Sequence, residues 1–285
     1  MVFNHYDSTG NLADYVLVHL QVLKTMGFSI VFVTTAPALT ATAVHRVAPL
    51  CWMVLLRPNR GLDLGGWPCA VKRIEFALGQ PLQRALSRLV IANDSVFGPL
   101  RPLAPVFDSM ARRHADIWGI TESIEREPHL QSYFLVFERR GLTFVRGWLR
   151  QFQFLEDKDA LVSKFEIGLS RQARLLGLNL QALVPYSAVQ QLVVNEPGML
   201  RLAVRERFTQ MHGRVNPTHV FWRELLVQLG SPYIKRDLLR KPDQLDPAAE
   251  SCMPFLAANF SAEACSLIAG YLTNDPQAQS TLQVL

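Results

Sequence analysis

Residues 89–98 read Leu89-Val90-Ile91-Ala92-Asn93-Asp94-Ser95-Val96-Phe97-Gly98, an apolar run that gives way abruptly to Asn-Asp-Ser. A few buried apolar residues between turn formers are typical of an inner strand of a parallel sheet. In open α/β sheets, ligands bind just outside the carboxyl ends of such strands. The pattern therefore predicts that Asp94 lies at a cleft, where its carboxylate could hold a metal ion or a sugar hydroxyl. Because Asn and Asp are also common turn formers, a purely structural turn is the alternative.

Three earlier apolar runs have the same character and are separated by stretches with helical spacing. Leu12, Val16, Leu20 and Leu23 recur at intervals of four, four and three, which is typical of one buried helical face. Asn11 is the predicted N-cap of that helix. The order strand, helix, strand predicts a mainly parallel sheet with helices on both faces. We expect its strands near residues 2–6, 29–33, 51–56 and 89–92, and helices at 38–47, 68–78 and 82–88.

The second half of the chain has helical composition after two more strand-like runs, at residues 116–123 and 131–137. These patterns predict an α/β core over residues 1–195 and a helical C-terminal extension over 196–285, packed on the core. The polar run 241–250 is predicted to be a linker or a surface loop. The helices are expected at 142–154, 158–176, 187–194, 198–211 and 217–230.

The composition limits the class of protein. Of 285 residues, 49% are hydrophobic and 19% charged, which is enough apolar content for a packed core. There is neither a signal-peptide pattern nor an apolar stretch of membrane-spanning length, and the four cysteines lack metal-ligand spacing, so we expect a cytoplasmic protein with free thiols. The net charge of +5 suits an anionic partner, but the basic residues are scattered, which argues against nucleic-acid binding.

A glycine-rich segment follows the third predicted strand and reads Arg57-Pro58-Asn59-Arg60-Gly61-Leu62-Asp63-Leu64-Gly65-Gly66-Trp67. Three glycines in eleven residues indicate a loop whose backbone approaches another group closely. The glycine order is not that of a dinucleotide-binding fingerprint, and no Gly-Lys-Ser/Thr follows as in a Walker loop.

Several segments in the same order resemble the rhamnan synthesis protein F family, bacterial glycosyltransferase-like proteins of polysaccharide assembly. The resemblance extends from about Val2 to Arg240, and the ordered series is more specific than any single segment. The matching segments are His5-Tyr6-Asp7, Ile30 to Thr34, Arg57 to Trp67, Asn93 to Pro99, Trp118 to Ser123, His129 to Phe134, Phe165 to Ser170, Asn216 to Trp222 and Pro232 to Arg236.

The resemblance implies a GT-A-like sheet and the transfer of a sugar, typically rhamnose, from a nucleotide-diphospho-sugar to a glycan or lipid-linked glycan acceptor. In such sheets an Asp-x-Asp pair after the fourth strand commonly grips a divalent metal. This sequence departs from that pattern, because Asn93-Asp94-Ser95 offers one carboxylate. Mg²⁺ relies largely on substrate phosphates, so Asp94 alone could serve as the protein ligand of Mg²⁺ or Mn²⁺.

Glycosyl transfer needs positive charge at the leaving diphosphate and a carboxylate base at the acceptor hydroxyl. Arg57, Lys235 and Arg236 are candidates for the positive charge, with solvated surface residues as the alternative. Glu166, between apolar neighbours, is the first candidate for the base; Asp63 is the second, and could instead bind ribose or sugar hydroxyls. The remaining candidates are His5, Asp7, Thr34, Asn59, Gly61, Asn93, Asp94 and Ser95 for the donor, and Glu122, His129 and Gln131 for the acceptor side.

Two further hypotheses remain open. The single Asp94 is compatible with a catalytically inert module that holds a nucleotide or glycan in the same cleft. The segment around Arg201, Arg205 and Arg207 and the Lys235-Arg236 pair are compatible with peripheral contact at the inner face of the plasma membrane. A core-facing helix with a solvated basic side is the alternative for that segment.

Overall fold

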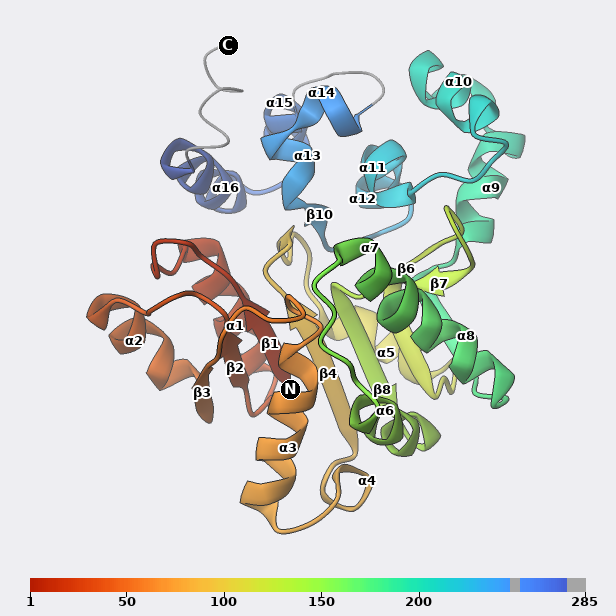
Figure 1. Cartoon of the computed structure of the whole chain (residues 1–285). Helices are drawn as coiled ribbons and strands as arrows, with labels where there is room; N and C mark the ends of the chain where they lie inside the picture. Colours follow the sequence, from red (N-terminus) through yellow and green to blue (C-terminus); the bar gives the residue numbers. More distant parts are fainter. Residues whose placement is uncertain (247–251, 276–285) are drawn as a thin grey trace. The chain divides into compact units, whose positions relative to one another are not determined.

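The computed structural model describes residues 1–246 and 252–275 and divides the chain into two compact units. The first unit comprises Met1–Asp94, Phe107–Ile120 and His129–Ala182, and the second comprises Ser95–Val106, Thr121–Pro128 and the described residues from Leu183 onward. The predicted boundary at residue 195 falls inside the second unit. Figure 1 shows the elements of both units.

Four parallel strands form one half of the main sheet, in the order β3-β2-β1-β4. Val2 of β1 lies opposite Val31 of β2 on one side and Ile91 of β4 on the other. The prediction of a mainly parallel α/β sheet is confirmed. Because parallel strands point the same way, their carboxyl ends form one edge. The strands are β1 (Val2–His5), β2 (Val31–Thr34), β3 (Met53–Leu56) and β4 (Arg88–Asn93).

The sheet continues beyond β4 with antiparallel pairs. Leu89 of β4 lies opposite Phe137 of β8, and β8 also pairs antiparallel with β6. The strand predicted at 131–137 begins at Phe134 in the structure, three residues later than expected. The partly buried strand β9 was not predicted. The added strands are β6 (Ile117–Ser123), β7 (His129–Leu130), β8 (Phe134–Glu138) and β9 (Leu180–Val184).

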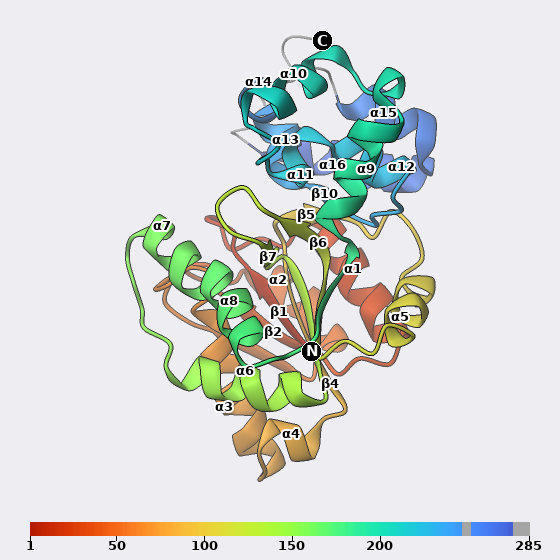
Figure 2. The same ribbon diagram turned by 90° about the vertical axis from the view of Figure 1, so that its right-hand side faces the viewer.

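Helices cover both faces of the sheet, as predicted, and Figure 2 shows α8 (Gly168–Leu175) and α1 (Asp14–Thr25) on opposite sides. On one face, α3 (Gly66–Leu78) buries Trp67, Ala70, Val71 and Ile74, a spacing that places all four on one helical stripe. Burying each large apolar side chain stabilises the fold by roughly 1.5–3 kcal/mol.

The opposite face packs against α1 through aromatic contacts. Phe3 meets His19 edge to face, with ring centroids 5.3 Å apart. Burial lowers the pKa of His19 to about 3, so its imidazole is neutral and acts as a core side chain.

The remaining helices of the first unit show where local signals were misleading. The first helix begins at Asp14 and its N-cap is Ala13, not Asn11, whose side-chain amide instead donates to Thr9 Oγ1. The predicted helix at 82–88 ends at Ala85, because Arg88 already belongs to β4. These elements are α2 (Ala41–Val47), η1 (Ala48–Leu50), α4 (Leu82–Ala85), α6 (Arg140–Arg150), α7 (Lys158–Leu161) and the π-helical turn η2 (Val162–Ile167).

The second unit is mainly helical and has its own core. That core buries Val204, Leu225 and Phe221. Its one described ribbon pairs β5 (Val96–Phe97) antiparallel with β10 (Ile234–Lys235). Its helices are α9 (Tyr186–Asn195), η3 (Pro197–Met199), α10 (Leu202–Gln210), α11 (Pro217–Val220), α12 (Trp222–Val227), α13 (Arg236–Arg240), α14 (Pro242–Leu245), α15 (Cys252–Asn259) and α16 (Ala262–Asn274); α5 (Ala104–Ala111) spans the boundary between the units in sequence.

The helices of the second unit agree in part with the predicted ones. The basic helix α10 faces the core through Val204, so its interpretation as a core-facing helix is confirmed. The helix predicted from Pro217 to Gly230 breaks at Phe221 into α11 and α12. Residues 242–245 of the predicted loop are helical, whereas 247–250 lie outside the described residues. All four cysteines are free thiols. Within residues 1–246 and 252–275, no helix is both long enough and apolar enough to cross a membrane.

Candidate functional site

The carboxyl edge of the parallel strands gathers polar side chains from β1 and β2. His5 ends β1 and lies opposite Thr34, which ends β2. His5 Nδ1 and Thr34 Oγ1 are 3.1 Å apart, and both residues are buried. The hydroxyl of Thr34 also accepts a hydrogen bond from the backbone N–H of Ala36 at 3.2 Å. The edge thus begins with a buried imidazole and hydroxyl held in fixed register.

Asp94 is anchored by β1 and α1. The backbone N–H of Tyr6 donates to Asp94 Oδ2 at 3.2 Å, and the hydroxyl of Tyr15 donates to the Asp94 carbonyl at 2.9 Å. The N–H of Asp94 in turn donates to the carbonyl of Asn4. Tyr6 is 88 positions away, so this carboxylate contact is not that of a local Asx-turn, although the backbone at Asp94 does turn.

Asp63 reaches the same edge from the loop after β3. The Asn93 side-chain amide donates to Asp63 Oδ2, and the backbone N–H of Leu64 donates to Oδ1 at 3.0 Å. Asn4 lies beside them. In the amide orientation that satisfies both of its ends, it donates to the Asp63 carbonyl at 3.3 Å and accepts from Trp67 Nε1 at 3.2 Å. The carboxyl group of Asp63 is thus held by Asn93 and Leu64, and its backbone carbonyl by Asn4.

A second acid, Glu166, acts on Asp63 through its charge. Burial raises the pKa of Asp63 above its ordinary value of 3.8, and the negative charges of Glu166 and, to a smaller extent, Asp94 raise it further. The hydrogen bonds from Asn93 and Leu64 oppose this shift. The raised pKa distinguishes Asp63 from an ordinary surface carboxylate, and environments of this kind are used at acid–base sites.

Glu166 is held on a π-helical turn, and such turns are frequent at functional sites. Its Oε1 accepts the backbone N–H of Ser132 at 2.9 Å. Two residues earlier, the N–H of Leu130 donates to Ser170 Oγ at 3.0 Å. The segment 129–132 is therefore tied to the helix that carries Glu166. His129 and Gln131, the predicted acceptor-side residues, are both buried within that segment.

The glycine-rich loop folds around the side chain of Arg57. Its guanidinium donates to the carbonyls of Leu62, at 3.1 Å, and Arg60, and its centre lies 5.7 Å from the Phe154 ring centroid. Gly61 has φ +72°, and a Cβ at Gly65 would lie 2.3 Å from the Arg60 carbonyl oxygen. The close approach predicted for this loop is thus made by its own backbone. Arg57 organises the loop, while Asn59 is exposed.

Asp7 and Glu122 each have a hydrogen-bonding role in the fold. Asp7 Oδ1 accepts from the N–H and hydroxyl of Thr9 and from the N–H of Asn11. Glu122 belongs to the second unit, where its Oε2 accepts the N–H of Tyr186 at the start of α9. These contacts give both residues a structural function, whatever else they do.

Ser95, Lys235 and Arg236 lie together in the second unit. Lys235 Nζ donates to Ser95 Oγ at 3.4 Å, and the N–H of Arg236 donates to the Ser95 carbonyl at 3.0 Å. The Arg236 guanidinium lies 5.9 Å from the Tyr271 ring centroid. The structure thus brings these three predicted residues together around the β5–β10 ribbon.

Asn4, Trp67 and Ser132 make contacts at this edge and were not among the predicted residues. Asn4 is the one polar residue inside the apolar run of β1 before His5, and Trp67 directly follows Gly65-Gly66, so both had a signal. Ser132 acts through its backbone N–H, which no residue type reveals.

A metal would find few protein ligands at this edge. Among the described residues, no group of three or more His, Cys, Asp or Glu side chains is arranged to hold a metal ion. Asp94, with one carboxylate oxygen already accepting from Tyr6, fits as a single protein ligand. Mg²⁺ accepts such a set when substrate phosphates and water complete its coordination.

The fold and this edge define an α/β protein with acidic side chains at the carboxyl ends of parallel strands. The chain belongs to the rhamnan synthesis protein F family, whose model matches residues 30–196. It is 27% identical over 200 residues to the virulence protein VirA of Vibrio anguillarum. The matched stretch covers 67% of this chain and 63% of that protein. The chain therefore spans less than two thirds of that relative.

Two other similarities are weaker. The uncharacterized protein y4gN of Sinorhizobium fredii is 25% identical over 179 residues, which is 60% of this chain and 45% of that protein. A solved structure from Desulfovibrio desulfuricans G20, described as a nucleotide-diphospho-sugar transferase, superposes with a TM-score of 0.39 and 13% identity. The superposition covers 75% of this chain and 98% of that one.

Proposed function

We propose that this chain is a GT-A-type glycosyltransferase that moves a sugar, rhamnose, from a nucleotide-diphospho-sugar to a hydroxyl of a glycan or lipid-linked glycan. Membership of a family named for rhamnan synthesis supports the substrate class. The observation that carries the proposal is the cluster of Asp63, Asn93 and Glu166 at the carboxyl edge, where burial and charge raise the pKa of one carboxyl group beside another.

The proposed chemistry assigns each acid one task. Glu166, oriented by the Ser132 N–H, takes the proton of the acceptor hydroxyl as that oxygen bonds to the anomeric carbon. The bond from that carbon to the diphosphate oxygen breaks, and the diphosphate leaves with the bonding electrons. Asp63, whose pKa burial raises, is proposed to hold a sugar hydroxyl of the donor. If Glu166 is not the base, Asp63 takes that role.

The leaving diphosphate needs positive charge. Asp94 is the residue that would hold Mg²⁺ or Mn²⁺, and the bound cation would neutralise the developing charge. Lys235 and Arg236 are proposed to contribute as well. The other proposed donor residues are His5, Asp7, Thr34, Arg57, Asn59, Gly61, Asn93 and Ser95, and the proposed acceptor-side residues are Glu122, His129 and Gln131.

The test is a panel of nucleotide-diphospho-sugars offered to the full chain with Mg²⁺ or Mn²⁺. We expect a nucleotide-rhamnose to raise the melting temperature, because a ligand of the native state stabilises it, and to release nucleoside diphosphate. Release that stops on chelation and returns with metal supports the role of Asp94. If the chain binds a nucleotide-sugar but releases no nucleoside diphosphate with any acceptor glycan, it is an inert binding module instead.

Peripheral contact with an anionic leaflet is a separate part of the proposal. Arg205 and Arg207 are exposed on α10, whereas Arg201 is paired with Asp246 and is not available to lipid. Attraction of this kind is about 1 kcal/mol per basic residue near the surface and depends on salt. Co-sedimentation with anionic vesicles at low ionic strength tests it, and protein that stays in the supernatant there contradicts it.

A further inference from the structure

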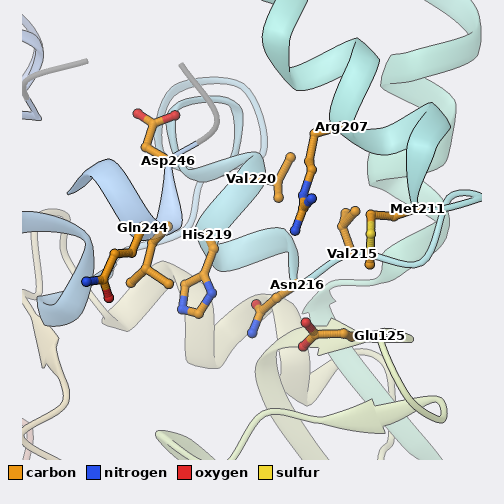
Figure 3. A pocket seen from close by; sticks show the side chains of 10 residues that line it. Glu125, Arg207, Met211, Val215, Asn216, His219, Val220, Gln244 and Asp246 are labelled. Atoms are coloured by element: carbon orange, nitrogen blue, oxygen red, sulfur yellow. The ribbon is translucent and has the colours of Figure 1, made fainter. Parts of the chain in front are cut away.

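The second unit contains a cavity of about 420 Å³ whose lining residues all belong to that unit. Its volume falls in the range of roughly 300–1,000 Å³ that small-molecule sites occupy. Figure 3 shows side chains that converge on it from α10, α11, α14 and the segment after β6. The polar residues that line it are Glu125, Arg207, Asn216, His219, Gln244 and Asp246.

Two of these polar residues are already occupied by the fold. Asn216 Oδ1 caps α11 by accepting the N–H of Thr218 at 3.1 Å and its hydroxyl at 2.7 Å. Asp246 accepts from Arg201 at 3.1 and 3.2 Å and from Trp222 Nε1 at 3.0 Å. They form the framework of the cavity.

The other four have unused hydrogen-bonding capacity. Within the described part of the chain, the side chains of His219, Arg207, Glu125 and Gln244 make no hydrogen bond. In Figure 3, Arg207 extends from α10 toward α11, while Asn216 and Glu125 lie beside each other. Because these groups come from different segments and meet at one cavity, they can bind several atoms of a single ligand at once.

The charges at the cavity favour a neutral ligand. Arg207 and Glu125 contribute one charge of each sign to the lining, and Asp246 forms an ion pair with Arg201. Burial and the positive charge of Lys235 lower the pKa of His219 to about 4, against the opposing charge of Asp237, so its imidazole is neutral and offers one donor and one acceptor. A diphosphate would need surplus positive charge, whereas hydroxyl groups both donate and accept.

The apolar part of the lining suits a carbohydrate as well. Met211, Val215 and Val220 form an apolar wall next to the polar groups, against which the C–H groups of a sugar ring can pack. We propose that this cavity binds a neutral, hydroxyl-rich ligand, a short segment of the acceptor glycan. The proposal that a glycan binds here rests on the cavity itself. Only its assignment as the acceptor rests on the proposed function.

The test measures binding of a rhamnose trisaccharide to the full chain by calorimetry, with saturation-transfer NMR to locate the contacts. We expect Arg207→Gln to weaken binding about tenfold, because it removes a charged donor, and Gln244→Ala to weaken it less. The matched control is Arg205→Gln, which changes an equally exposed arginine on the same helix that does not line the cavity.

Three outcomes would overturn the inference: no binding of the trisaccharide, equal loss in Arg207→Gln and Arg205→Gln, or displacement of the sugar by inorganic diphosphate. A parallel assay of nucleotide release keeps the two proposals apart. Trisaccharide binding through Arg207 without nucleotide release supports the cavity and overturns the proposed function. Nucleotide release without trisaccharide binding supports the proposed function and overturns the cavity proposal.

Discussion

Asn93 donates its side-chain amide hydrogen to the carboxylate of Asp63, thirty positions earlier in the chain. Asp63 belongs to the loop after β3, and Asn93 ends β4, while β2 and β1 lie between those two strands in the sheet. The loop therefore crosses the carboxyl ends of β2 and β1 to reach β4. This single hydrogen bond closes the loop over the edge where the acidic cluster forms.

Asp63→Asn should change how stability depends on pH. Because the folded pKa of Asp63 lies above its ordinary value of 3.8, the folded state holds this proton more tightly than the unfolded state. Its contribution to stability is therefore lost as pH rises from about 3.8 toward the raised folded value. Asp63→Asn has no such proton to lose. Relative to the natural chain, its free energy of unfolding should therefore increase as pH rises over this range.

Chemical denaturation at a series of pH values measures the effect of Asp63→Asn. Glu166→Gln is the informative comparison, because the Glu166 charge is the second cause of the raised pKa. Replacing it should shrink the pH dependence that Asp63 contributes. Parallel stability curves for all three proteins would contradict the assignment of the proton to Asp63.

Glu166→Gln should separate binding from turnover. The amide oxygen of glutamine can still accept the N–H of Ser132, so the loop and the donor site should persist. Loss of a general base costs about 10²–10⁴-fold in rate. Steady-state release of nucleoside diphosphate and donor titration measure the two effects. The exposed Glu156→Gln is the matched control, and unaltered turnover in Glu166→Gln would move the role of base to Asp63.

Asp94→Asn should abolish transfer with little effect on stability. Asparagine keeps an oxygen for the N–H of Tyr6, so the free energy of unfolding should change by less than about 1 kcal/mol. Loss of the charge should lower turnover by about a hundredfold or more. Melting temperature and initial rate are the readouts, with Asp14→Asn as the exposed control of equal charge change. A variant that unfolds, or that retains activity, would identify Asp94 as a structural turn residue.

Gly66→Ala should destabilise the protein by about 1–3 kcal/mol, because of overpacking. A Cβ at this position would lie 2.1 Å from a terminal atom of the Asn4 side-chain amide and 3.3 Å from Val33. Gly270→Ala, in the interior of α16, is the control, because its Cβ would meet nothing within 4 Å and should stabilise the helix by about 1 kcal/mol. Urea denaturation measures both changes, and a stabilised Gly66→Ala would show that Asn4 can move freely.

The parallel half of the sheet could be predicted because β2 and β4 carry continuous apolar runs, as inner strands of a parallel sheet require, whereas the edge strand β3 is only partly buried. The antiparallel strand β8 was placed only approximately, since apolar periodicity does not reveal strand direction. The boundary of α4 was missed because Leu86 to Arg88 suits a helix as well as a strand, and pairing with β8 decided the outcome.

The candidate site was harder to predict for a physical reason. The location of Asp94, Asn93 and Thr34 at one edge of the sheet could be predicted, because each follows or ends a predicted strand and topology alone puts such ends together. Nothing in the sequence indicated that Arg57 would be occupied by the carbonyls of its own loop. The effect of Glu166 on Asp63 depends on two segments a hundred residues apart, and such proximity is a property of the fold alone.

The π-helical turn that carries Glu166 amounts to one extra residue inserted into an otherwise regular helix. Leu161 before the turn and Leu169 after it contact the same core, so the helix keeps its packing on either side. Excising a single residue from Val162–Ile167 would remove the bulge and restore ordinary winding, with Leu161 and Leu169 still on the same face of the helix. The turn from which Glu166 reaches the N–H of Ser132 would be lost. The extra residue therefore sets the position of the acidic group, while the packing of the helix on either side does not depend on it.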